Sequence, residues 1–304
     1  MTRREGLGLL LAAGAGMALA EPVAGQAVTW PRTLVDALQR SVRIAAPPQR
    51  IVTVFPSNVE ILFALGLADR VVAIGGRVRH PPEALGKPSV GGALGYSPEA
   101  VAAYRPDLLV LTPSHQTAFG LVEPFTRAGV PVLMLAHPDL PSVLRNIALV
   151  GQATGAEAQA ERLGGQMLQQ LEAVRARWHG VPPRSVYLET AAAERGAFQT
   201  IGRGHYADDA LAWAGGRNVF SDLNGSQQVS AEAIAVRDPE VIISLQAVPK
   251  PAASIAARPG WQHLRAVRDG RVVVLERGHK LIPGPRQIEA VLDYARALHP
   301  ERFA

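Results

Sequence analysis

The sequence predicts an α/β fold of two lobes, each with a mainly parallel sheet flanked by helices, joined by a single long α-helix. Three observations favour this architecture. The chain has 304 residues, enough for two domains of ordinary size. One segment recurs at a fixed offset, and a long amphipathic stretch separates its two copies. The predicted boundaries are 28–140 for the N-terminal lobe, 141–180 for the linking helices and 181–304 for the C-terminal lobe.

The N-terminus has the features of an export signal. Arg3 and Arg4 precede an apolar run over 7–20, which is shorter than the roughly 20 residues that cross a bilayer. Small residues follow at positions that suit signal peptidase. We therefore expect residues 1–27 to be a cleaved signal peptide and the mature protein to lie in the periplasm.

The first βα unit follows the signal. A strand is predicted over 50–54, because the four residues after Arg50 are all β-branched, and a helix is expected from Pro56. Ser57 and Glu60 have the spacing of a capping box at the start of that helix. Residues 71–74 then predict the next strand.

The most informative feature is an internal repeat. The segment 97–110, SPEAVAAYRPDLLV, aligns without a gap on 230–243, SAEAIAVRDPEVII, at an offset of 133 residues. Each copy has a serine that can cap a helix, an acidic first turn, a proline stop and a buried strand. The repeat therefore predicts two similar α/β units.

Between the two units the texture is helical. We expect a short helix over 141–150 and a longer one, capped by 154–157, that runs to about Trp178. Its apolar side chains recur every three or four residues and form one stripe, made of Leu163, Met167, Leu171, Val174 and Trp178. About 22 residues at 1.5 Å each span about 33 Å, enough to bridge two lobes. A stiff helical connection predicts small closing motions.

The second unit restarts with a strand over 185–188 and a helix over 206–214, which two glycines end. Strands that alternate with helices in this way are typical of parallel sheets.

Composition excludes several classes of protein. Cysteine is absent, so disulfides, thiolate metal sites and cysteine nucleophiles are excluded. The net charge of +5 is spread along the chain and is not clustered with aromatic residues, which argues against nucleic-acid binding. The sequence contains no G-x-S-x-G elbow, Walker A loop or dinucleotide-binding motif, so we expect no catalysis. A secreted α/β hydrolase is the alternative from another class.

These segments together resemble the periplasmic binding proteins for cobalamin, haem and ferric siderophores. The resemblance covers nearly all of the mature chain and rests on the long helix and on four stretches: RIVTVFPSNVEILFALGLADRVVAIGG, VGGALGYSPEAVAAYRPDLLVL, GRNVFSDLNGSQQVSAEAIAVRDPEVII and PGPRQIEAVLDYARALHP. It implies a monomer without a cofactor of its own, which binds a metal chelate between its lobes and delivers it to an ABC permease dimer.

The same resemblance assigns two docking residues. In that family one glutamate on each lobe pairs with permease arginines, and the matching positions here are Glu99 and Glu232. The internal repeat selects the same pair independently. Equivalent carboxylates on related lobes suit a two-fold partner. Acidic residues also stabilise helix N-termini without any partner, which is the plainer interpretation.

Ligands of this fold class lie at the strand ends that face the cleft, and we therefore predict ligand-binding residues at those ends. The first lobe supplies Ser57, Arg77, Arg79, His80, Tyr96 and His115, and the second supplies Arg203, His205, Tyr206, Gln246, His279 and Lys280. Guanidinium groups bind carboxylate or catecholate oxygens in pairs, so the arginines favour a ferric siderophore or a related iron complex.

Three other ligands stay open. Cobalamin would be expected to bind between aromatic walls, but only 5% of residues are aromatic, and Ala93 stands where cobalamin binders carry a stacking tryptophan. Haem would take Tyr96, His80 or His205 as its axial ligand. A bare divalent metal would be held by His80, His137 and His205, although the sequence has no HxH or HExxH motif.

Overall fold

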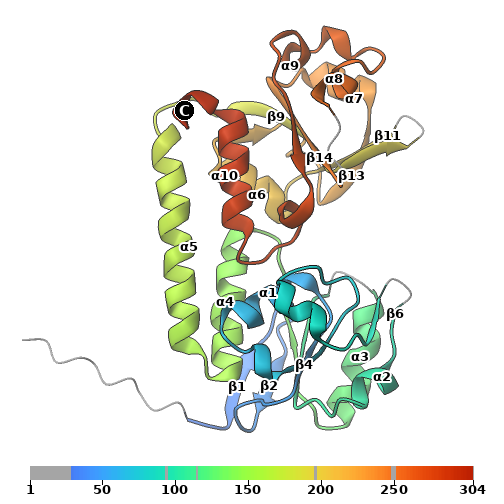
Figure 1. Cartoon of the computed structure of the whole chain (residues 1–304), viewed down its shortest axis with the longest axis vertical. Coiled ribbons are helices and arrows are strands. Elements are labelled where there is room, and N and C mark those ends of the chain that lie inside the picture. Colours follow the sequence, from blue (N-terminus) through green and yellow to red (C-terminus); the bar gives the residue numbers. More distant parts are fainter. Residues whose placement is uncertain (1–28, 93–94, 114–115, 195–196, 248–250, 304) are drawn as a thin grey trace, which may run out of the picture.

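Two lobes and a long connecting helix make up the molecule (Figure 1). The computed structural model describes residues 29–92, 95–113, 116–194, 197–247 and 251–303. We call the part from β1 to β8 the N-terminal lobe and the part from β9 to α10 the C-terminal lobe. The predicted signal peptide lies outside the described residues. No helix in the described part of the chain is long and apolar enough to cross a membrane.

The N-terminal lobe is built on a four-stranded parallel sheet. Its strands, in spatial order, are β4 (Val71–Ile74), β3 (Ile51–Thr53), β7 (Leu108–Leu111) and β8 (Val132–Met134). They are apolar along almost their whole length, as expected for a sheet covered on both faces. The helices are α1 (Pro56–Ala64), α2 (Pro98–Ala102) and α3 (Gln116–Arg127). Two antiparallel pairs are added, β1 (Arg32–Val35) with β2 (Ser41–Ile44) and β5 (Gly91–Gly92) with β6 (Gly95–Tyr96).

The C-terminal lobe repeats this plan. Its parallel sheet has the order β12 (Gly216–Asn218), β9 (Arg184–Glu189), β14 (Val241–Gln246) and β15 (Val272–Glu276). An antiparallel sheet adds β10 (Ala191–Glu194), β11 (Ala197–Ile201) and β13 (Ser226–Ser230). The helices are α6 (Tyr206–Trp213), α7 (Ala231–Arg237), α8 (Ala252–Ala256), α9 (Arg265–Arg268) and α10 (Gln287–Leu298). Short 3₁₀ turns are η1 (Ala68–Arg70), η2 (Pro82–Gly86), η3 (Trp261–His263), η4 (Gly278–Leu281) and η5 (Pro300–Arg302).

The internal repeat is confirmed at the level of single hydrogen bonds. Ser97 Oγ accepts from the Ala100 amide at 3.2 Å, and Ser230 Oγ accepts from the Ala233 amide at 3.2 Å. The strands that follow, β7 and β14, occupy the same place in their sheets, beside the first strand of each parallel sheet. The two sheets therefore share one strand order.

Two consecutive helices connect the lobes, α4 (Leu140–Thr154) and α5 (Glu157–Trp178). The predicted 22-residue helix is confirmed, and Met167, Leu171 and Val174 of its stripe are buried. The helix predicted over 141–150 is longer, because Gly155, at a φ of 76°, is the first residue that leaves the helical conformation.

Two predicted caps are wrong. Helix α1 begins after Phe55, with Pro56 in its first turn, so Ser57 lies inside the helix and caps nothing. Helix α5 begins without a side-chain cap, and the Thr154 hydroxyl donates instead to the Val150 carbonyl of α4 at 2.7 Å. In both cases the serine or threonine lies one to three residues away from the observed boundary, which shows how weakly a short motif fixes a helix start.

One hydrophobic cluster runs through both lobes. It contains Val110 of β7, Val150 of α4, Leu171 of α5, Val241 of β14 and Leu298 of α10. Helix α10 packs against α5 and α6, which joins the C-terminal lobe to the connecting helix. The linking helices are therefore part of a continuous core.

Candidate functional site

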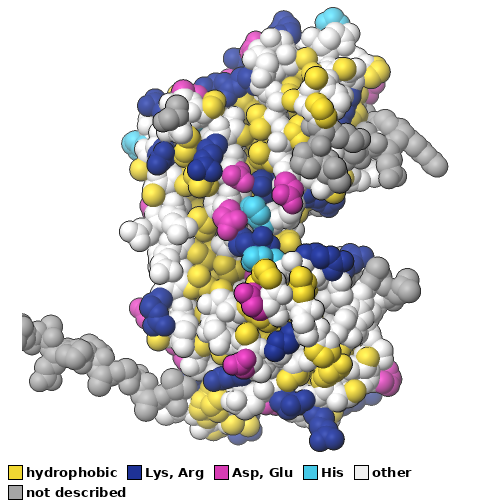
Figure 2. Space-filling model, viewed as in Figure 1, with side chains coloured by type: hydrophobic (Ala, Val, Ile, Leu, Met, Phe, Trp, Pro, Cys, Tyr) yellow, Lys and Arg dark blue, Asp and Glu magenta, His cyan; other side chains and the backbone are white. Residues whose placement is uncertain are grey.

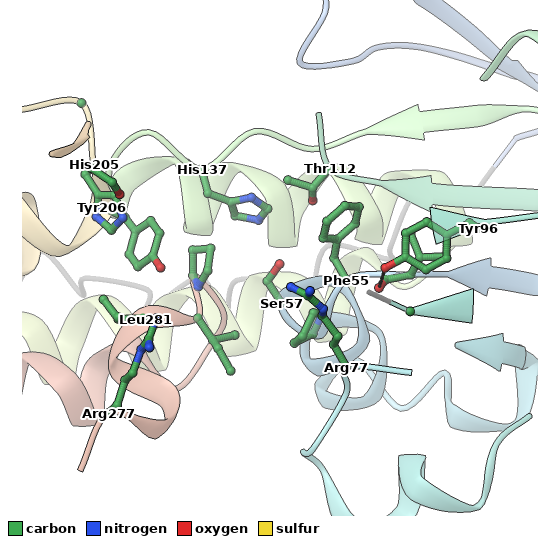
Figure 3. A pocket seen from close by; sticks show the side chains of 17 residues that line it. Phe55, Ser57, Arg77, Tyr96, Thr112, His137, His205, Tyr206, Arg277 and Leu281 are labelled. Carbon is green, nitrogen blue, oxygen red and sulfur yellow. Dashed lines mark hydrogen bonds between the residues drawn. The ribbon is translucent and has the colours of Figure 1, made fainter. Parts of the chain in front are cut away.

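A cavity of about 730 Å³ lies between the lobes. Figure 2 shows the hollow from outside, and Figure 3 shows that side chains of both lobes face each other across it. The lining residues are Val54, Phe55, Pro56, Ser57, Arg77, Gly92, Tyr96, Thr112, His137, Gly204, His205, Tyr206, Ser226, Arg277, Leu281, Ile282 and Pro283. The volume falls within the range of about 300–1,000 Å³ that is usual for small-molecule sites.

The N-terminal wall is built at the carboxyl ends of β3 and β7. Phe55 and Ser57 lie where β3 passes into α1. The Tyr96 hydroxyl donates to the Val54 carbonyl at 3.2 Å, and its ring meets Phe55 edge to face at 6.4 Å. Burial raises the pKa of Tyr96, so its hydroxyl keeps its proton. The part of this wall made by Phe55 and Tyr96 is therefore aromatic and uncharged.

The C-terminal wall is built at the start of α6. His205 Nδ1 accepts from the Ala207 amide at 3.1 Å and caps the helix, which leaves the ring proton on Nε2. Burial lowers the pKa of His205 to about 4 and raises that of Tyr206, whose ring centroid lies 4.3 Å from the imidazole. At neutral pH these two side chains are uncharged.

His137 lies between the two walls, just beyond the end of β8 (Figure 3). Neither ring nitrogen has a hydrogen-bond partner among the described residues. Burial lowers the pKa of His137 to about 4, so the ring is neutral and one nitrogen carries a free lone pair. Buried polar atoms without a protein partner are uncommon, and His137 has one donor and one acceptor that no described residue uses.

The two charged groups of the lining are arginines from opposite lobes. Arg77 follows β4, and Arg277 follows β15. Neither guanidinium makes a hydrogen bond or an ion pair with any residue that the structure describes, and no carboxylate stands among the described lining residues. The cavity is therefore electropositive on both sides and suits an anion.

The structure brings some of the predicted ligand residues together. Ser57, Arg77, Tyr96, His205 and Tyr206 line the cavity. His115 and Ala93 lie outside the described residues.

The other predicted residues do not line the cavity, and most have partners elsewhere. The Arg79 guanidinium donates to the Gly76 carbonyl at 2.9 Å, and Arg203 Nε donates to Asn224 at 2.8 Å. His80 lies near Glu60, whose pKa is raised by burial, and the charge of a protonated His80 opposes that rise. The Arg79 and Arg203 side chains therefore bond within their own lobes.

Three further predicted residues have their partners within the C-terminal lobe. Gln246 is buried and donates to Glu189 at 3.2 Å. Lys280 is buried and pairs with Asp293 at 2.8 Å, while the His279 ring lies 3.7 Å from Glu289.

Sequence reasoning missed part of the lining. Arg277 stands one residue beyond the last strand, the same rule that selected Arg77, and could have been found. Thr112 follows β7 in the same way. The apolar loop residues Leu281–Pro283 carry no sequence signal for a site.

Glu99 and Glu232 occupy equivalent exposed positions in the first turns of α2 and α7. A hydrogen bond from Ser97 lowers the pKa of Glu99, and one from Ser230 lowers the pKa of Glu232. Both helices lie on the side of the molecule opposite α5, one at the end of each lobe (Figure 1). Each lobe thus presents an ionised carboxylate in the same local geometry.

Comparisons with known proteins agree with this architecture. The sequence matches the family described as periplasmic binding protein over residues 51–277. It is 29% identical over 279 residues to an uncharacterized ABC transporter substrate-binding lipoprotein, YvrC, of Bacillus subtilis, covering 90% of this chain and 87% of that one. It is 27% identical to a cobalamin-binding protein of Halobacterium salinarum, covering 91% and 76%. A periplasmic heme-binding protein structure from Pseudomonas aeruginosa has a TM-score of 0.70 at 29% identity, covering 83% and 93%.

Proposed function

Because this chain belongs to the periplasmic binding protein family, we propose that it is the substrate-binding component of an ABC importer and that its ligand is an anionic iron chelate. The family consists of binding proteins and not of enzymes. The observation that carries the ligand class is the pair of unpaired guanidinium groups, Arg77 and Arg277, on opposite sides of one cavity. A ligand with anionic groups at both ends would bridge the lobes.

The rest of the lining supports a chelate over a bare cation. The aromatic and apolar side chains Phe55, Tyr96, Tyr206 and Leu281 present a large organic surface. Among the described residues, no three metal-ligating side chains stand together. A ferric siderophore with carboxylate or catecholate oxygens matches both the arginines and the apolar walls.

Haem is the second candidate, and His137 is the observation that favours it. Haem carries two carboxylates for the arginines, and its iron takes an axial nitrogen or phenolate. Either His137 or Tyr206 would approach the iron from the cavity wall. A Soret band that shifts when His137 is replaced by alanine would favour haem over a ferric siderophore.

The ligand test uses native mass spectrometry with haem, cobalamin, ferric citrate and a ferric tricatecholate. We expect the anionic iron complexes to bind and cobalamin to bind weakly. Arg77→Gln and Arg277→Gln should each weaken binding by about 10- to 100-fold, the range for a hydrogen bond to a charged group. Arg79→Gln is the matched control, because that guanidinium is already bound to backbone carbonyls. The proposal would be contradicted if cobalamin bound tightly and if Arg77→Gln and Arg277→Gln both kept the affinity of the wild type for the iron complexes.

The proposed docking residues are Glu99 and Glu232. Their support is positional: equivalent helices of two lobes carry them, both are exposed, and a two-fold permease offers two equivalent surfaces. Complementary charge would steer the encounter and fix its orientation.

The docking test measures uptake of iron-55 by cells that make only the variant protein. Glu99→Arg with Glu232→Arg should abolish uptake, while the purified variant keeps its affinity for the chelate. Glu161→Arg, an exposed glutamate on α5, is the control and should leave uptake unchanged. Normal uptake by the double variant would remove the docking role.

A further inference from the structure

A buried ion pair joins the two lobes beside the cavity. Arg286 Nη2, in the C-terminal lobe, donates to Glu60 Oε1 of α1 at 2.6 Å. Within the described part of the chain, no other ion pair connects the N-terminal lobe directly to the C-terminal lobe. The Glu60 side chain is 3% exposed and that of Arg286 is 23% exposed. This contact is thus a shielded charged link across the seam.

Both ends of the pair are fixed to their own lobes. Glu60 lies in the middle of α1, and Gly284 approaches it so closely that a Cβ there would lie 2.7 Å from Oε2. Arg286 directly precedes Gln287, whose buried amide donates to the His279 carbonyl at 3.0 Å and to the Ile282 carbonyl at 2.7 Å. Because both residues are held in place, the distance between their charged groups depends on the relative position of the lobes.

The ion pair makes one hydrogen bond, although an arginine and a carboxylate can form two. Glu60 Oε2 and Arg286 Nε are both buried, and neither has a partner in the described structure. Nε and Nη2 lie on the same edge of a guanidinium, and that edge pairs with both oxygens of a carboxylate in two parallel bonds. Since buried donors and acceptors are nearly always paired, the unused donor and acceptor match each other.

We propose that Glu60 and Arg286 form a two-position latch across the lobes, with one hydrogen bond in the arrangement seen here and two after the lobes shift on ligand binding. The pair stands next to the cavity lining on both sides. Ser57 precedes Glu60 by one helical turn, and Pro283 lies in the loop that carries Arg286. A ligand that draws these linings together moves both ends of the latch. The latch therefore rests on the proposed binding function and regulates the same site.

The test measures the distance between the lobes by electron spin resonance. The chain has no cysteine, so Ala102→Cys and Ala235→Cys, at exposed equivalent positions of the repeat, accept one spin label each. In ligand-free protein we expect a narrow distance distribution that broadens in Arg286→Lys, which keeps the charge but loses the fork, and in Glu60→Gln. Arg237→Lys alters an ion pair with Asp222 inside the C-terminal lobe and should leave the distribution unchanged.

The second position is tested with a ferric tricatecholate as the probe. We expect the probe to shift the distance between the labels in the wild type. In Arg286→Lys the second hydrogen bond cannot form, so the affinity for the probe should fall about tenfold, a usual size for coupling between sites. If ligand-free Arg286→Lys and Glu60→Gln gave the same distribution of label distances as the wild type, the latch proposal would be wrong. Because this comparison is made without ligand, it decides whether the ion pair restrains the lobes even if no iron chelate binds, in which case the proposed ligand class alone fails.

Discussion

Replacement of Arg258 by leucine is expected to destabilise the C-terminal lobe by about 4 kcal/mol. The guanidinium pairs with Glu189, whose side chain is 0% exposed, through two hydrogen bonds. Ser244 and Gln246 also donate to this carboxylate, at 2.7 and 3.2 Å. Removal of the cation leaves a buried carboxylate with two neutral donors.

The magnitude follows from the two contacts that the arginine makes. Breaking a buried ion pair by removing one partner costs about 3–5 kcal/mol. The guanidinium also stacks over the rings of Phe198 and Trp261, at 5.1 and 4.6 Å, and each such contact contributes about 0.5–1 kcal/mol. Leucine keeps part of the apolar contact, so we place the sum near 4 kcal/mol. A loss of that size is a large share of the 5–15 kcal/mol typical of folded proteins.

The assay is urea unfolding at pH 7, followed by the fluorescence of tryptophan, including Trp261 beside the pair. The double variant Arg258→Leu with Glu189→Leu should recover most of the loss, because an apolar pair needs no compensation for a buried charge. A loss below about 1 kcal/mol in the single variant, or a double variant no more stable than the single one, would refute the reasoning.

Leu171→Ala in the stripe of α5 should cost about 2–5 kcal/mol, whereas Leu168→Ala, 46% exposed on the same helix, should stay within about 0.5 kcal/mol; thermal unfolding distinguishes them. Gln246→Ala should lower the urea midpoint and leave chelate affinity unchanged, since the amide bonds to Glu189 outside the cavity; a large affinity loss would restore it to the site. His137 and His205 titrate near pH 4 when folded and near 6.5 when unfolded. The unfolded chain therefore takes up protons first, and the stability present above pH 6.5 is lost as the pH falls toward 4, by about 1–2 kcal/mol per histidine at pH 5. Urea unfolding at pH 7 and 5 checks this, and a pH-independent midpoint would contradict it.

The fold was predictable because its signals are local and periodic. The strand over Val71–Ile74 matches residue for residue, and the 22-residue helix α5 follows from its apolar spacing. The repeat at Ser97 and Ser230 predicted two lobes because the same cap, helix and strand had to fold twice. The predicted lobe boundaries stay predictions.

The site was predictable only in part, because the end of a strand identifies the region of a site but not the direction in which each side chain points. Arg77 and Arg79 stand two residues apart in one loop, yet only Arg77 lines the cavity, while Arg79 turns to backbone carbonyls of its own loop. Gln246 ends a strand as expected, but a buried carboxylate on the neighbouring strand takes its amide. Such choices depend on neighbours that are distant in the sequence.

The continuous core has a consequence for how the protein is made. Helix α10 is the last α-helix among the described residues, yet its Leu298 belongs to the same cluster as Leu171 of α5 and Val110 of β7. A nascent chain can assemble the first sheet early, but α5 keeps an uncovered apolar side until α10 has been made. The first half therefore keeps apolar surface exposed until the C-terminal residues have been made. Loss of those residues would expose apolar surface in both halves of the molecule.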